Sequence, residues 1–152
     1  MVFETAPAVA TSAPPANALL AVLKRRWPTV AGVLLALAFA APEVSWIGVT
    51  VLIGAAVAYP AFGLYRGHLH GRTVLLVQSA AFVAFVGLAV VILLVDVTLG
   101  SYLLAAGFLA HGIWDFAHHR ADRMVPRWYA EFCAVIDVLI ALFLVLGAVT
   151  SG

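Results

Sequence analysis

Five apolar runs occupy most of the chain, and four of them are long enough to cross a membrane as helices. The runs extend over residues 28–41, 44–62, 73–95, 99–117 and 128–149. A helix needs about 20 mostly apolar residues to cross a bilayer, so only the first run is short. Charged residues make up 10% of the 152 residues, whereas soluble domains contain about 25%. We therefore predict an all-α membrane protein with about five transmembrane helices, in which residues 28–152 form a single domain.

The first run, 28–41, also has the features of a secretory signal peptide. Basic residues precede it, its middle is apolar, and it ends in the small-residue sequence Ala38-Phe39-Ala40, which resembles a cleavage site. We expect the run to remain as an uncleaved first span. Its removal would leave the topology of the other runs unchanged.

Two shorter segments precede this run. Residues 1–17 are rich in Ala, Pro, Ser and Thr without periodicity, which predicts a disordered tail. Residues 18–27 form a predicted amphipathic segment with Asn17 as its N-cap. The segment ends in Lys24-Arg25-Arg26-Trp27, and such charged and aromatic side chains anchor a helix at a membrane surface.

Basic residues occur only in alternate connections between the runs. They are Lys24, Arg25 and Arg26 before the first run, Arg66 and Arg72 between the second and third, and Arg120, Arg123 and Arg127 between the fourth and fifth. The other two connections, 41–45 and 96–100, contain no Lys or Arg. The positive-inside rule then places the amino terminus in the cytoplasm and the carboxyl terminus outside. We expect an integral membrane protein of a plasma membrane or bacterial-type inner membrane.

A short internal similarity suggests a repeat. Residues 63–72 align with residues 112–120 at an offset of 49, which pairs Tyr65 with Trp114. Each segment follows the first run of a predicted helical hairpin. Two parallel hairpins of this kind are one repeat arrangement found among transport proteins, so the sequence predicts a weak repeat of two hairpins.

The segment 111–120 places three histidines and an aspartate at the end of an apolar run. On a helix, Asp115 and His118 project within about 40° of His111, and His119 projects about 80° away. Ionisable groups at such positions are costly and point to a functional site. Histidine and carboxylate ligands suit iron, zinc, copper or manganese. We predict a transition-metal site with His111, Asp115, His118 and His119 as ligands.

Two acidic residues of the last run lie level with this segment. At 1.5 Å per residue, His111 and Asp137 are about 13 and 15 Å from the basic connection that joins their helices. We therefore expect these two side chains to face each other within hydrogen-bond or shared-ligand reach. The pair has either a functional role or only the structural role of a buried hydrogen bond that fixes the helix register. Glu131 lies level with Asp115. Glu131 and Asp137 are the predicted catalytic residues, as ligand, partner of a ligand or general base, and Gln78 is predicted to hydrogen-bond between helices.

The pattern Asp115-x-x-His118-His119 is similar to one histidine box of the membrane desaturase and hydroxylase families, with aspartate in place of the first histidine. The similarity covers five residues. Those families use several such boxes to hold a di-iron centre, and His68-x-His70 is the only other segment here with a related pattern. The resemblance implies an iron centre but not membership of these families.

We expect a metal-binding integral membrane protein. The leading interpretation is a metal-dependent enzyme that acts on a lipid or another hydrophobic substrate. Haem is a weaker variant, because no attachment motif is present. One alternative is a proton-coupled transporter or channel subunit that uses a His/Asp relay, which with five helices would need a homo-oligomer; another is a non-catalytic subunit. The net charge of +1 gives no basis for nucleic-acid binding. Cys133 has no partner for an intrachain disulfide.

Overall fold

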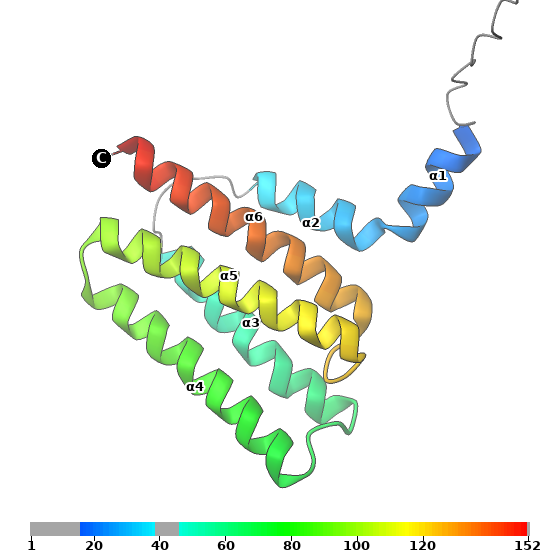
Figure 1. Cartoon of the computed structure of the whole chain (residues 1–152), viewed down its shortest axis with the longest axis horizontal. Helices are drawn as coiled ribbons and strands as arrows, with labels where there is room; N and C mark the ends of the chain where they lie inside the picture. The colour runs from blue at the N-terminus through cyan, green and yellow to red at the C-terminus, as the bar shows by residue number, and fades with distance from the viewer. Residues whose placement is uncertain (1–15, 39–45, 152) are drawn as a thin grey trace, which may run out of the picture.

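The computed structural model describes residues 16–38 and 46–151, and all regular secondary structure in these two ranges is helical. In chain order, the helices are α1 (Ala16–Arg25), α2 (Trp27–Ala38), α3 (Trp46–Tyr65), α4 (Arg72–Leu94), α5 (Val97–Ala121) and α6 (Arg127–Ser151) (Figure 1). The predicted all-α class is confirmed for this part of the chain.

Four helices, α3 to α6, are long and apolar enough to cross a membrane. They contain 20, 23, 25 and 25 residues and correspond to four of the predicted runs. The main difference is at the end of α5, which continues past residue 117 through both His118 and His119. The helix ends at Ala121, because the following residue, Asp122, has a left-handed φ of 49° that stops helical hydrogen bonding.

The first predicted run corresponds in part to α2. This helix has 12 residues and a length of about 18 Å, less than the roughly 30 Å of a bilayer core. Residues 39–41, the end of the predicted run, lie outside the described residues. The described ranges therefore contain four helices of spanning length and one shorter apolar helix.

Helix α1 lies where the sequence predicts a helix before the first run, but it begins at Ala16, so Asn17 is inside the helix and is not its N-cap. The rest of the predicted tail lies outside the described residues. The proposed repeat gains no support from the rings it pairs, because Tyr65 is exposed whereas Trp114 packs against Tyr59 and His118 inside the bundle.

Helix α5 lies in the middle of the bundle. It contacts α3, α4 and α6, while α2 packs along α6 and α3 packs against α4 (Figure 1). Small residues explain how closely α5 is surrounded, because they let helix backbones approach where lipid provides no hydrophobic force between helices. The small residues buried on α5 are Gly100, Ser101, Ala105, Gly107 and Gly112.

Large apolar side chains fill the core on both sides of α5. Leu104 and Phe108 of α5 pack with Leu52 of α3, Ile92 of α4 and Leu144 of α6. This core occupies the half of α5 nearer its amino-terminal end. In the other half of α5, the polar residues His111 and Asp115 are also buried.

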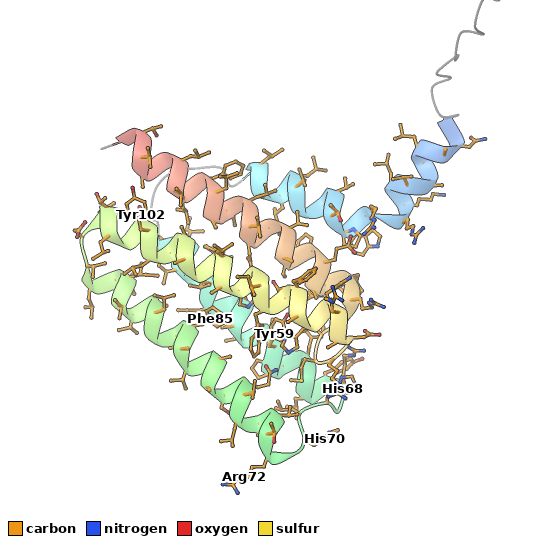
Figure 2. The ribbon with its side chains drawn as sticks, in the orientation of Figure 1. Tyr59, His68, His70, Arg72, Phe85 and Tyr102 are labelled. Atoms are coloured by element: carbon orange, nitrogen blue, oxygen red, sulfur yellow. The ribbon has the colours of Figure 1, made fainter. Side chains whose placement is uncertain are left out.

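All the basic connections lie at one end of the bundle. The ends of α3 and α5 and the starts of α4 and α6 meet there, and so does the junction of α1 with α2 (Figure 1). His68, His70 and Arg72 mark this end, and Tyr102 marks the opposite one (Figure 2). We call it the basic end. The charge pattern of the sequence and the three-dimensional arrangement agree on this asymmetry.

Gly32 allows α2 to pack directly on the backbone of α6. A Cβ at position 32 would lie 2.9 Å from the carbonyl oxygen of Phe132 and 3.2 Å from Cβ of Val135. We expect Gly32→Ala to lower the free energy of unfolding in detergent by about 1–3 kcal/mol, because the added methyl group forces the two helices apart.

Gly54→Ala and Gly87→Ala are matched controls, since a Cβ at either position meets no atom within 4 Å. Both should be neutral or slightly stabilising, as alanine favours helix over glycine by about 1 kcal/mol. Equal stability of all three variants in chemical denaturation would contradict direct packing at Gly32.

Candidate metal centre

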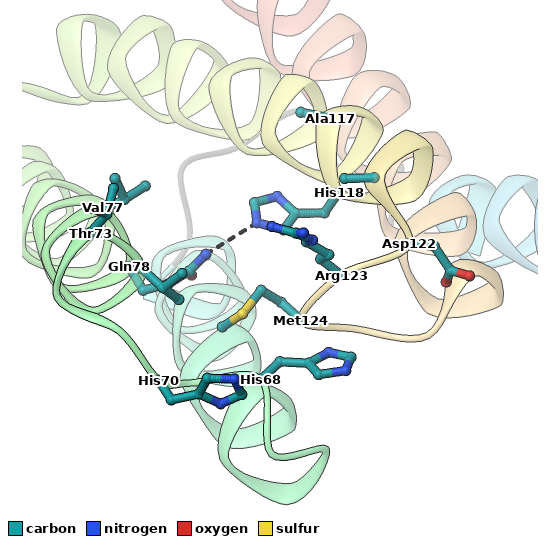
Figure 3. A pocket seen from close by; sticks show the side chains of 12 residues that line it. His68, His70, Thr73, Val77, Gln78, Ala117, His118, Asp122, Arg123 and Met124 are labelled. Carbon is teal, nitrogen blue, oxygen red and sulfur yellow. Dashed lines mark hydrogen bonds between the residues drawn. The ribbon is translucent and has the colours of Figure 1, made fainter.

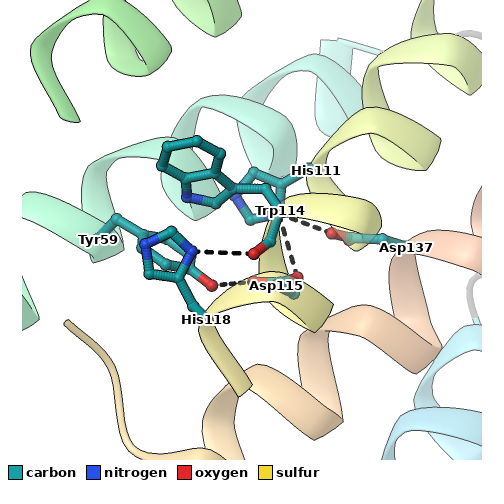
Figure 4. Close-up of polar contacts among 6 residues, drawn as sticks. All are labelled: Tyr59, His111, Trp114, Asp115, His118 and Asp137. Atoms are coloured by element: carbon teal, nitrogen blue, oxygen red, sulfur yellow. Dashed lines mark hydrogen bonds and ion pairs between the residues drawn. The ribbon is translucent and has the colours of Figure 1, made fainter. Parts of the chain in front are cut away.

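Three ionisable side chains meet between α5 and α6. Nδ1 of His111 lies 2.7 Å from Oδ2 of Asp137 and 3.3 Å from Oδ2 of Asp115 (Figure 4). One ligand atom from each residue lies within 4.8 Å of the other two. The predicted contact of His111 with Asp137 is confirmed. We call these three residues the His/Asp group.

The helices place these side chains by simple geometry. His111 and Asp115 are four residues apart on α5 and therefore share one face. Gly112 lies on the same side of the helix, and a Cβ there would be 3.4 Å from Cβ of Asp137. A residue as small as glycine at position 112 therefore leaves α6 close to α5 at the level where Asp137 reaches His111.

Tyr59 of α3 completes the surroundings of Asp115. Its hydroxyl donates a hydrogen bond of 2.5 Å to Oδ1 of Asp115, and its ring packs against His111, Trp114 and His118 (Figure 4). The sequence analysis missed this residue. The available signal was a tyrosine in the middle of an apolar run, because a buried tyrosine hydroxyl requires a hydrogen-bond partner.

The His/Asp group is removed from solvent. His111, Asp115 and Asp137 are 1%, 0% and 3% exposed, and no Lys or Arg is buried in ranges 16–38 and 46–151. Nε2 of His111 and Oδ2 of Asp115 have no hydrogen-bond partner there. Buried charges are costly unless they are paired or bind a metal ion. Two carboxylates beside one imidazole must therefore be balanced by protons or by a cation.

His118 lies outside the His/Asp group, although it was predicted as a ligand. Its Nδ1 lies 2.9 Å from the backbone carbonyl of Trp114 and its Nε2 lies 3.1 Å from Nε2 of Gln78. A carbonyl only accepts hydrogen bonds, so Nδ1 carries the hydrogen and Nε2 accepts from the Gln78 amide. The expected interhelical role of Gln78 is confirmed by this contact.

His119 and Glu131 are also separate from the group. Nδ1 of His119 donates to the backbone carbonyl of Arg127 at 3.0 Å. Glu131 accepts hydrogen bonds from Thr29 at 2.5 Å and from Arg26 at 3.4 Å. Glu131 thus ties the start of α2 to α6. The structure brings His111, Asp115 and Asp137 together and leaves the other predicted site residues with different partners.

An apolar cavity of 540 Å³ adjoins the group on the Asp137 side. It lies among α2, α3, α5 and α6, and of the described residues that line it only Asp137 is charged. Leu35, Val51, Phe108 and Phe132 represent the side chains around it. This size and lining are typical of a site for a small apolar ligand.

Comparisons with family models, with curated proteins and with solved structures find no match for this chain. The five-residue similarity to a histidine box also lacks support from the geometry, because His118 and His119 point to partners other than those of Asp115. The function therefore has to be inferred from the chemistry of the site.

The hydrogen bond from Tyr59 provides a test of the site geometry. We expect Tyr59→Phe to lower the free energy of unfolding by about 1–3 kcal/mol, because it leaves Oδ1 of buried Asp115 without its donor. Tyr102→Phe, at an exposed position in the same bundle (Figure 2), should change stability by less than about 0.5 kcal/mol. Equal unfolding curves for the two variants would contradict the contact of Tyr59 with Asp115.

Proposed function

We propose that this protein is an integral membrane protein that binds one divalent transition-metal ion through His111, Asp115 and Asp137. The observation that carries the proposal is the convergence of three buried ligand atoms within 4.8 Å of one another. Two ligands of one ion at bonds of about 2.1 Å lie about 3 Å apart at tetrahedral or octahedral angles. The separation of 3.3 Å at Nδ1 of His111 fits that spacing. The separation of 2.7 Å is a hydrogen bond, and it would widen by a few tenths of an ångström around a bound ion.

Charge balance supports a divalent ion. A neutral imidazole with two carboxylates carries a formal charge of −2, which one divalent cation neutralises. A net charge within the apolar bundle would be strongly unfavourable. His111, Asp115 and Asp137 would hold the ion, which would replace the proton of the hydrogen bond between His111 and Asp137.

The donor set limits the identity of the ion. One nitrogen and several oxygen ligands suit iron, zinc, manganese or copper, whereas calcium and magnesium prefer oxygen ligands alone. A single imidazole in the group does not supply the two axial histidines of a bis-histidine haem. Three protein ligands leave a coordination position for water or substrate, which is the arrangement of catalytic zinc sites.

The apolar cavity supports a hydrophobic substrate. Asp137 is both a member of the His/Asp group and part of the cavity wall, so a ligand in the cavity lies next to the metal position. A metal ion there would act as a Lewis acid or activate a water molecule. We therefore propose metal-dependent chemistry on a lipid or another apolar molecule, with Asp137 as the acidic residue nearest to it.

A proton relay is the second candidate, and a specific contact favours it. The hydroxyl of Tyr59, both carboxylates and the imidazole form one connected set of proton-bearing groups. Without metal, this set must hold protons to limit its charge. A proton-coupled transporter or channel subunit, assembled as a homo-oligomer, would use the same atoms, so metal and protons compete for them.

Metal content separates the two candidates. We expect purified protein to contain close to one transition-metal ion per chain by mass spectrometry, and His111→Ala and Asp137→Asn to reduce occupancy to background. His119→Ala and Asp122→Asn are the matched controls and should retain the ion. A folded protein that has no metal and gains no thermal stability from added zinc, iron, copper or manganese would overturn the metal proposal in favour of the relay, because a ligand specific for the folded state raises its stability.

We further propose five membrane crossings with a cytoplasmic amino terminus. Helix α2 starts at the basic end and α3 starts at the opposite end, so the chain changes ends between them (Figure 1). Helices α3 to α6 then cross four more times. Large exposed apolar side chains suit contact with lipid, among them Leu64, Val83, Ile113 and Val149.

Cysteine labelling tests this orientation. In a Cys133→Ser background, an impermeant thiol reagent added to intact cells should label Val97→Cys, at the end opposite the basic one. It should label Ala121→Cys only after the membrane is opened, because the basic end faces the cytoplasm. The reverse pattern would show that the orientation is wrong.

A further inference from the structure

A polar pocket of 740 Å³ opens at the basic end of the bundle. The loop before α4 lines it with His68 and His70, and the segment between α5 and α6 lines it with Asp122 and Arg123 (Figure 3). The formal charges of Asp122 and Arg123 offset each other. The pocket therefore offers imidazole nitrogens to a cation without a net positive charge from these two side chains.

Gln78 separates this pocket from the His/Asp group. Its side chain lines the polar pocket and also a cavity of 10 Å³ that Tyr59, His111 and Trp114 share. A cavity of that size holds about one water molecule. Among the described residues, only Gln78 borders both spaces. The pocket and the ring of His111 are thus one side chain apart.

His118 holds Gln78 in this position. It lines the pocket, and its Nε2 accepts the hydrogen bond from the Gln78 amide (Figure 3). Its ring also packs 4.8 Å from the ring of Tyr59, the residue that donates to Asp115. If Gln78 rotates away, Nε2 of His118 is left with a free lone pair toward the pocket, which is the state of an imidazole that binds metal.

We propose, on the basis of the metal-binding function above, that the polar pocket is the entrance through which a divalent metal ion reaches the His/Asp group. Gln78 closes the entrance, and His118 is a transient ligand that binds the ion after the Gln78 amide is displaced. After Gln78, the next residue on this path is His111, whose buried Nε2 has no hydrogen-bond partner in the described part of the chain.

The apolar cavity is a poor entrance for the same ion. Its lining reaches Asp137 through aliphatic and aromatic side chains, and a hydrated cation that crosses such a surface loses its water without replacement ligands. The two cavities therefore divide the access to the site, with the cation entering from the polar side and an apolar ligand from the other.

Chemical blocking of the pocket tests the entrance. Thr73 lines the pocket and is exposed, so Thr73→Cys in a Cys133→Ser background can be modified with a bulky, neutral methanethiosulfonate. Tyr65→Cys is the matched control, because Tyr65 is exposed at the same end but does not line the pocket. Loading of metal-free protein with Co²⁺ is then followed by visible absorption, and final occupancy is measured separately.

Modified Thr73→Cys should take up Co²⁺ at least about tenfold more slowly than the unmodified variant, because access to the site becomes rate-limiting. Its final metal occupancy should be unchanged. Modified Tyr65→Cys should load at the unmodified rate, and Gln78→Ala should load faster. Normal loading of modified Thr73→Cys, with full occupancy, would overturn the entrance and leave the metal site intact. Absence of Co²⁺ binding in the unmodified protein would overturn the metal site itself, and the entrance with it.

Discussion

The contact between His111 and Asp137 is the interaction on which the interior of this bundle depends. It joins the two most closely packed helices at a depth where neither group can reach water, so each needs the other. The remaining features follow from it. Asp115 is one turn from His111 on the same face and adds a second carboxylate to the His/Asp group. This carboxylate requires the hydrogen-bond donor that Tyr59 supplies from α3. The polar contacts between α5 and α6 are thereby extended to α3 through one hydrogen bond.

The sequence predicted this contact because it depends only on helix rise and a short connection. The four long helices were also predictable, because the length of an apolar run is enough to identify a helix that can cross a membrane. The predicted ligands His118 and His119 show where the method fails. His118 shares a projected direction with His111 and His119 projects about 80° away, but seven or eight residues of helix also separate them from His111 by about 10–12 Å along the axis. Angular projection omits that distance, and an ion cannot bridge it.

Other parts of the site depended on packing between distant segments. Glu131 was assigned to the site by depth, yet the short helix α2 packs along α6, and the partners of Glu131 are Thr29 of α2 and Arg26, the residue before α2. Tyr59 lies far from the histidines in the sequence, and nothing local shows which helix it faces. The partners of Glu131 and of Tyr59 both depend on which helices pack together. That arrangement results from many contacts between small and apolar side chains of segments far apart in the sequence.

Gly112 affects the distance between α5 and α6 at the His/Asp group. A methyl group at this position would just contact Asp137 and Val138, at 3.4 Å each, and any larger side chain would push α6 outward. The spacing of the ligands is consequently set by two backbones in near contact rather than by the length of flexible side chains. Metal–ligand distances tolerate errors of only about 0.2 Å. For the metal site proposed above, discrimination between ions of similar charge but different radius would then depend in part on a residue that has no side chain.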